Sequence, residues 1–234
     1  MLSGIPVIYG IDPFSTETVP SHQLGSIGIS NDGRKFRYAY VGASALVAGN
    51  LLQGPAEDTG DQGITPTAAA IGDTSVLTSS TMTVTANQYA GGYMIVTVTP
   101  GLGHIYRIKS HPAATAAALT FQLYESIRVA LTTTSRVDFV ANQFNGVIQN
   151  PATATSSPIG VAMTAAALNT YTWIQSGGVA SVLADGALTV GVNLSASNAT
   201  AGAVEAAVTA QAAIGYAVTG IATGEQGAVF LTLD

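Results

Sequence analysis

The sequence predicts an all-β fold made of short-stranded barrel or sandwich units with an extended N-terminal arm. Apolar and polar residues alternate over many short runs, which is the period of a half-buried strand. Gly, Pro, Asn and Asp separate these runs at the spacing of a sandwich or barrel. The 234 residues include 26 Gly and no Cys, so the fold must form without disulfides.

Residues 1–24 are expected to form the extended arm. Pro6, Pro13 and Pro20 recur at equal intervals, and proline removes ladder donors and favours extended backbone. The apolar side chains of the arm are Val7, Ile8, Tyr9, Ile11 and Phe14. We expect an arm of this kind to lie against another molecule; a disordered tail is the alternative.

Residues 25–149 are expected to form a first β domain. The run 93–98 is mostly apolar on both faces, which indicates a central strand. Other runs place one set of side chains on a common face: Phe36, Tyr38 and Tyr40; Tyr106 and Ile108; Leu119, Phe121 and Leu123; Ile127, Val129 and Leu131; Val137 and Phe139.

Residues 150–234 are expected to form a second, β-barrel-like domain that begins with a connector over 150–160. The stretch 176–197 carries one charge, Asp185, and small polar residues interrupt it throughout. It therefore predicts neither a membrane span nor an amphipathic helix, but packed strands joined by a turn. For residues 201–213 the Ala content leaves a helix open, and we favour a strand.

Charge is scarce and unevenly placed. Charged residues are 9% of the chain, against roughly 25% in ordinary globular proteins. The net charge is −6, which argues against nucleic-acid binding, and no apolar run is long enough for a transmembrane helix. The N-terminus has no secretory signal pattern. A surface with so little charge predicts assembly with copies of itself or with a larger body; the alternative is a soluble surface of Ser, Thr, Gly and Asn.

The C-terminal part resembles a known family. Residues 177–233 contain "GGVASVLADGALTVGVNLSAS", "AGAVEAA" and "IGYAVTGIATGEQGAVFLTL" in that order. This order resembles the small capsid decoration, or cement, proteins of tailed bacteriophages, whose compact barrel ends in an "IG-A" strand and a closing "V-x-L" strand. The resemblance implies a homotrimeric virion protein that binds the major capsid protein on the outer surface of the capsid and stabilises the head. The alternative is a phage tail or fibre component that binds a host surface glycan.

The sequence does not indicate an enzyme, a metal site or a cofactor. His22, His104 and His111 are the only histidines, and no carboxylate or second ligand stands at a fixed spacing from them. We interpret them as surface or loop residues. No G-x-S-x-G elbow occurs, although a glycosidase-type pair of carboxylates remains an alternative.

The acids of "EDTGD", Glu57, Asp58 and Asp61, could offer oxygen ligands to Ca²⁺ but lack the spacing of a calcium loop. A solvated acidic turn is the favoured interpretation.

The densest basic cluster is Arg34, Lys35 and Arg37. One interpretation is a solvated edge strand whose cations discourage pairing. The other is a docking patch for an acidic surface, which is either the capsid shell or the C-terminal region of a neighbouring copy. That region is a candidate because residues 137–234 contain no Lys or Arg.

Overall fold

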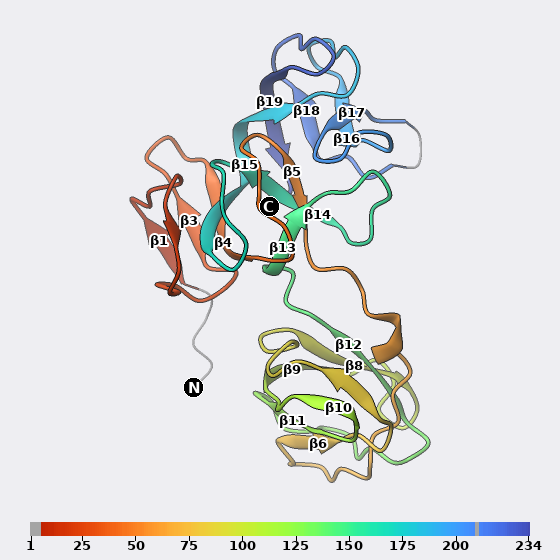
Figure 1. Ribbon diagram of the computed structural model, residues 1–234. Helices are drawn as coiled ribbons and strands as arrows, with labels where there is room; N and C mark the ends of the chain where they lie inside the picture. Colours follow the sequence, from red (N-terminus) through yellow and green to blue (C-terminus); the bar gives the residue numbers. More distant parts are fainter. Residues whose placement is uncertain (1–5, 209–210) are drawn as a thin grey trace. The chain divides into compact units, whose positions relative to one another are not determined.

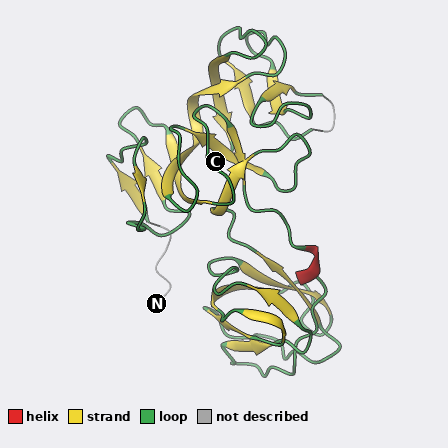
Figure 2. Ribbon diagram, viewed as in Figure 1, coloured by secondary structure: helices red, strands yellow, loops and turns green. Residues whose placement is uncertain are grey.

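The computed structural model describes residues 6–208 and 211–234, and it confirms the predicted all-β fold (Figure 2). The one helical element among these residues is a single 3₁₀ turn, η1 (Thr59–Asp61). Within the same described ranges, the structure contains no helix with the length and hydropathy needed to span a membrane.

The chain divides into two compact units. Unit 2 (Glu57–Asn142) is an insertion in unit 1, which comprises the residues up to Ala56 and Gln143–Asp234. The described part of unit 1 holds one sheet of twelve strands (Figure 1). These strands are β1 (Val7–Tyr9), β2 (Thr16–Glu17), β3 (Ile27–Ile29), β4 (Lys35–Val41), β5 (Leu51–Gln53), β13 (Asn145–Gln149), β14 (Pro158–Ala162), β15 (Tyr171–Leu183), β16 (Asn193–Ala196), β17 (Val204–Ala206), β18 (Gly215–Ala217) and β19 (Gln226–Thr232).

The boundary between the units differs from the expected domains, residues 25–149 and 150–234. The chain leaves unit 1 after β5 and returns at β13, which pairs with both β4 and β5. β14 continues this ladder, because it pairs with β5 and β15. The expected connector, residues 150–160, therefore lies inside unit 1, and its end belongs to β14.

β15 is the longest strand and joins the parts of the unit 1 sheet. Its first half pairs with β4 as far as Gly177↔Lys35, and its second half pairs with β19 from Gly177 onward. Gly178 has φ +86°, a left-handed value that other residues adopt only with strain. A Cβ at Gly178 would also lie 3.0 Å from Cγ of Arg34. Glycine here therefore lets β15 lie close to the stem of Arg34.

The described part of the N-terminal segment pairs with its own chain, which argues against the alternative of a disordered tail; its expected contact with another molecule stays a prediction. β1 pairs in parallel with β3, and β2 pairs with β15. Ile8 and Ile11 pack against the buried cluster of Phe36, Tyr38 and Trp173. The segment is extended, as expected, but β1 and β2 make it part of the unit 1 sheet. Residues 1–5 of the expected arm lie outside the described residues.

Unit 2 is a small barrel-like unit. Its five-stranded sheet has the order β12-β8-β9-β11-β6, and β10 pairs with β7. Backbone hydrogen bonds join Ile64 to Val137 and Thr67 to Leu77, so the segment between Ile64 and Thr67 bridges the two outer strands. The strands are β6 (Ser75–Leu77), β7 (Met82–Val84), β8 (Tyr93–Val98), β9 (Ile105–Ser110), β10 (Ala114–Ala117), β11 (Thr120–Leu123) and β12 (Arg136–Val140). The interior position of β8 confirms the central strand predicted for 93–98.

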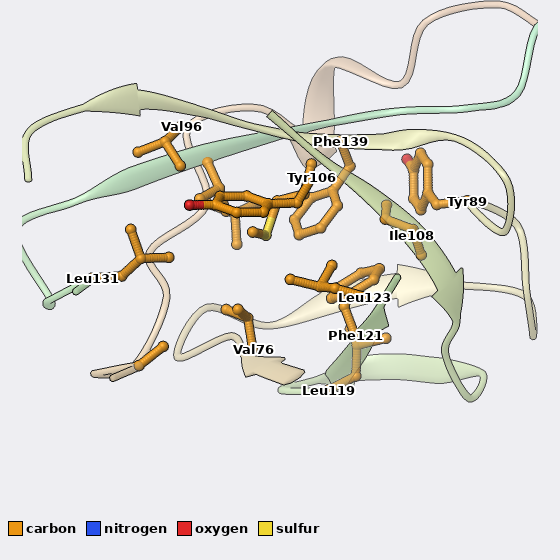
Figure 3. Close-up of a cluster of buried hydrophobic side chains, with 14 of the residues drawn as sticks. Val76, Tyr89, Val96, Tyr106, Ile108, Leu119, Phe121, Leu123, Leu131 and Phe139 are labelled. Carbon is orange, nitrogen blue, oxygen red and sulfur yellow. The ribbon is translucent and has the colours of Figure 1, made fainter. Parts of the chain in front are cut away.

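The core of unit 2 lies between these strands, and its side chains point toward one another (Figure 3). The rings of Phe121 and Phe139 stack with centroids 4.1 Å apart. The structure confirms three of the predicted inward-facing sets, whose members are all buried: Tyr106 and Ile108; Leu119, Phe121 and Leu123; Val137 and Phe139.

The run 127–131 is a loop, so the strand predicted there is wrong. Ile127 and Leu131 are buried, but each is held by hydrogen bonds across the unit: the Ile127 N–H donates to the carbonyl of Asp73, and Leu131 forms a single bridge with Ala69. Because Ile127 and Leu131 are buried and stand four residues apart, they have the same spacing as two residues on one face of a strand.

The stretch 176–197 forms core, as its small apolar side chains predicted. Its buried apolar side chains, Ala180, Val182, Ala184, Leu188 and Leu194, belong to one hydrophobic cluster of unit 1. The favoured strand within residues 201–213 is present as β17, while residues 209–210 lie outside the described part of the chain.

Candidate docking surface

Arg34, Lys35 and Arg37 lie where β4 begins, with Lys35 and Arg37 on one side of the strand. β4 pairs with β3, β13 and β15, so it is an interior strand and the edge-strand interpretation is wrong. Protection of a sheet edge therefore does not explain why three cations cluster at this strand.

Arg37 forms an ion pair with Asp234. Nε and Nη2 of Arg37 donate to the two carboxylate oxygens, and Nη1 donates to the carbonyl of Gly25 at 3.0 Å. The Ser176 hydroxyl donates to the same carboxylate at 3.0 Å. The hydrogen bonds from Arg37 are the main reason that the pKa of Asp234 lies below its usual value. β15 lies between β4 and β19 in the sheet, and this pairing brings the end of β19 close to β4.

The other two cations differ in their partners. Nε of Arg34 donates to Asp32 at 2.7 Å, and the Ser30 hydroxyl also donates to Asp32. The hydrogen bond from Ser30, followed by that from Arg34, lowers the pKa of Asp32. Nζ of Lys35 donates to the backbone carbonyl of Asp234 at 3.4 Å. The expected positive patch is therefore mostly neutralised by the chain's own acids, and its docking role stays a prediction.

A hollow of about 670 Å³ opens beside these side chains. Arg34 and Lys35 lie on one side of it, Gly177 and Gly178 leave room in its floor, and Phe230 lies on the other side. A second hollow of about 590 Å³ shares Asp32 and Arg34 with the first and extends to Phe14. The ion pair of Arg34 and Asp32 therefore lies between two adjoining hollows.

An apolar row borders the first hollow. Val179 on β15 pairs with Phe230 on β19, which pairs with Tyr216 on β18. The rings of Tyr216 and Phe230 stack with centroids 5.3 Å apart, and Val179 and Tyr216 are exposed. Paired side chains of neighbouring strands lie on one face of a sheet, so these three form a continuous outward row.

The N-terminal segment adds a second apolar feature, which we call the N-terminal strip. Four of its large apolar side chains are exposed although β1 and β2 hold the segment in place. Tyr9 and Val19 are 75% and 74% exposed, and Val7 and Phe14 are exposed as well. Phe14 also lines the second hollow, so the strip is continuous with the ion pair of Arg34 and Asp32.

The histidines occupy three different environments. His22 contacts the rings of Tyr38 and Trp173, with centroids 5.2 and 5.3 Å away. Nδ1 of His104 bonds the carbonyl of Gly101 at 3.0 Å. His111 lies in the loop after β9, within the surface-or-loop interpretation, but it is only 4% exposed and is therefore not a surface residue.

His111 belongs to a buried polar network in unit 2. Its Nε2 accepts from the N–H of Tyr89 at 3.0 Å, its Nδ1 donates to the carbonyl of Pro112 at 2.8 Å, and its ring lies 4.8 Å from that of Phe121. The hydroxyl of Tyr89 donates to the carboxylate of Asp61. Burial lowers the pKa of His111 and raises the pKa of both Asp61 and Tyr89, because it disfavours each charged form.

The acidic turn is thus only partly solvated. Asp61 is buried and bonded to Tyr89, whereas Asp58 caps η1 by accepting from the N–H of Gly60 at 3.0 Å. Across residues 6–208 and 211–234, no three His, Asp or Glu side chains are grouped closely enough to hold a metal ion. The hydrogen bonds of Asp58 and Asp61 tie the acidic turn to unit 2.

Comparisons of the chain with protein-family models, with curated proteins and with solved structures found no match.

Proposed function

We propose that the chain is a structural virion protein that binds the outer surface of a phage capsid, through the major capsid protein, and stabilises the head. The observation that supports this most is the N-terminal strip. Val7, Tyr9, Phe14 and Val19 are exposed on a segment that strand pairing already holds in place. An ordered apolar strip can bind a surface with little loss of conformational entropy.

The energies indicate which feature of the docking surface would drive attachment. Complete burial of one large apolar side chain contributes about 1.5–3 kcal/mol, whereas an exposed ion pair contributes about 0–1 kcal/mol. Arg34 and Arg37 are already paired within the chain, which leaves Lys35 to interact with an acidic partner. The apolar strip therefore drives binding, and Lys35 contributes to orientation.

Co-sedimentation of the purified chain with undecorated capsids tests the proposal. The parent chain should bind until the sites are saturated. The double variant Tyr9→Ser, Phe14→Ser should bind at least about tenfold more weakly, since about 1.4 kcal/mol of lost burial is enough for that change. Its unfolding should match that of the parent, because both side chains are exposed.

Val190→Ser is the matched control, because Val190 is 70% exposed in unit 1 but lies outside the strip. It should bind as the parent does. A parent chain that does not bind capsids, or a double variant that binds as tightly as the parent, contradicts the proposal.

A further inference from the structure

The outer face of the unit 2 sheet carries aromatic, aliphatic and basic side chains together. Tyr93 on β8 pairs with Arg107 on β9, and the N–H of Tyr124 donates to the carbonyl of Arg107 at 3.0 Å. Ile105 and Lys109 stand two residues from Arg107 on the same side of β9, opposite the buried Tyr106 and Ile108. We call Tyr93, Ile105, Arg107, Lys109 and Tyr124 the basic face.

The cations of the basic face form no ion pair within the described residues, where the two ion pairs are Arg34–Asp32 and Arg37–Asp234. The carboxylate of Glu125 accepts instead from the backbone N–H of Arg107 at 2.8 Å. The guanidinium of Arg107 lies over the ring of Tyr124, 5.0 Å from its centroid. Arg107 is therefore held in position with its charge available to a partner.

Unit 1 carries the complementary charge at the turn after β15. Asp185, Glu205 and Glu225 lie on adjoining segments: the N–H of Asp185 donates to the carbonyl of Val204 at 2.7 Å, and the N–H of Ala184 donates to that of Glu225 at 2.9 Å. We call these three acids the acidic end. Residues 137–234 contain no Lys or Arg, so no cation from this part of the chain neutralises them.

We infer that the basic face of one copy binds the acidic end of a second copy, head to tail. Tyr and Arg are the side chains that most often dominate protein interfaces, and opposite charges set the orientation of the two copies. Because the two surfaces differ, the contact is heterologous: each copy would use its basic face toward one neighbour and its acidic end toward another. The inference goes beyond the proposed function, because attachment to a capsid does not by itself require contact between copies.

Sedimentation velocity of the purified chain, in the absence of capsids, tests this contact. The basic-face variant Arg107→Glu, Lys109→Glu and the acidic-end variant Glu205→Lys, Glu225→Lys should each associate at least about tenfold more weakly than the parent. An equimolar mixture of the two should associate again, because the intact acidic end of the first meets the intact basic face of the second. Arg128→Glu, an exposed unit 2 cation outside the basic face, is the control and should associate as the parent does.

A parent chain that stays monomeric at every concentration overturns the inference, and so do variants that associate normally or a mixture that fails to reassociate. Circular dichroism of each variant must match the parent, so that misfolding is not taken for lost contact. The sedimentation experiment contains no capsids, so it tests the contact between copies separately from capsid binding. A chain that stays monomeric here but still co-sediments with capsids would contradict this contact and leave the proposed function in place.

Discussion

The guanidinium of Arg37 binds the carboxylate of Asp234 across 197 residues of sequence. The pair joins the first residues of β4 to the segment after β19, and the hydroxyl of Ser176 on β15 donates to the same carboxylate. Three strands of the unit 1 sheet therefore meet at one carboxylate, beside the hollow that Arg34 and Lys35 line.

Asp234→Asn should lower the free energy of unfolding by about 1–2 kcal/mol at neutral pH, because it weakens charge-assisted hydrogen bonds that are partly screened by solvent. The pKa of Asp234 is lowered in the folded state. The ionised carboxylate of Asp234 therefore contributes to the free energy of unfolding above the unfolded-state pKa of about 3.9. This contribution is lost as the pH falls through the lower pKa of the folded state. Urea unfolding of parent and variant, at neutral pH and well below that pKa, measures the difference.

The control is Glu225→Gln, since Glu225 is exposed and forms no ion pair within the described residues. It should unfold as the parent does at both pH values. A destabilisation by Asp234→Asn that persists unchanged in acid would mean that the charge of Asp234 does not matter.

His111 should make unit 2 sensitive to mild acid. Burial lowers its pKa below the unfolded value of about 6.5, so its contribution to stability is present above that pH and is lost as the pH falls through the folded pKa. The titratable groups beside it are Asp61 and Tyr89. The pKa of Asp61 is raised, so its contribution has the opposite sign: it is present at low pH and lost as the pH rises through the folded value.

Thermal unfolding of the parent between about pH 7.5 and about pH 5 should show unit 2 losing stability across that window. His111→Gln should be less stable than the parent at about pH 7.5, but its stability should depend much less on pH over this window. His104→Gln, which alters a half-buried histidine of the same unit, should keep the pH dependence of the parent. Equal slopes for the parent and His111→Gln would exclude His111 as the source.

Gly178→Ala should destabilise unit 1 more than Gly186→Ala. Both glycines have left-handed φ values, +86° and +90°, so each substitution costs about 1–2 kcal/mol of backbone strain. At Gly178 the new Cβ would also meet Cγ of Arg34 at 3.0 Å, whereas at Gly186 nothing lies within 4 Å. Chemical denaturation measures the free energy of unfolding of each variant. Equal decreases for the two variants would show that the side chain of Arg34 moves aside without cost.

Local patterns predicted local structure well. The alternation of Leu119, Phe121 and Leu123 identifies a strand face because the period of a strand is a property of neighbouring residues. The same pattern misled at Ile127 and Leu131, where two loop anchors imitate a strand.

Long-range features were not predictable from the sequence. The partner of Arg37 is Asp234, and nothing near either residue indicates the other, because the pairings of β15 with β4 and β19 bring them together. The burial of His111 depends likewise on Tyr89 and Phe121, which stand on other segments. Within the candidate docking surface the sequence indicated the cations and the apolar N-terminal segment, but not the acids that pair with the cations or the row formed by Val179, Phe230 and Tyr216.

The most direct test of the proposed capsid role is the copy number of the chain in phage virions purified from the source that encodes it. Quantitative mass spectrometry would compare its peptides with those of the major capsid protein and of the tail proteins. The account predicts a fixed ratio to the major capsid protein, as binding sites repeated over the shell require. A copy number that matches the few copies of a tail or fibre component, or absence from the virion, would contradict it.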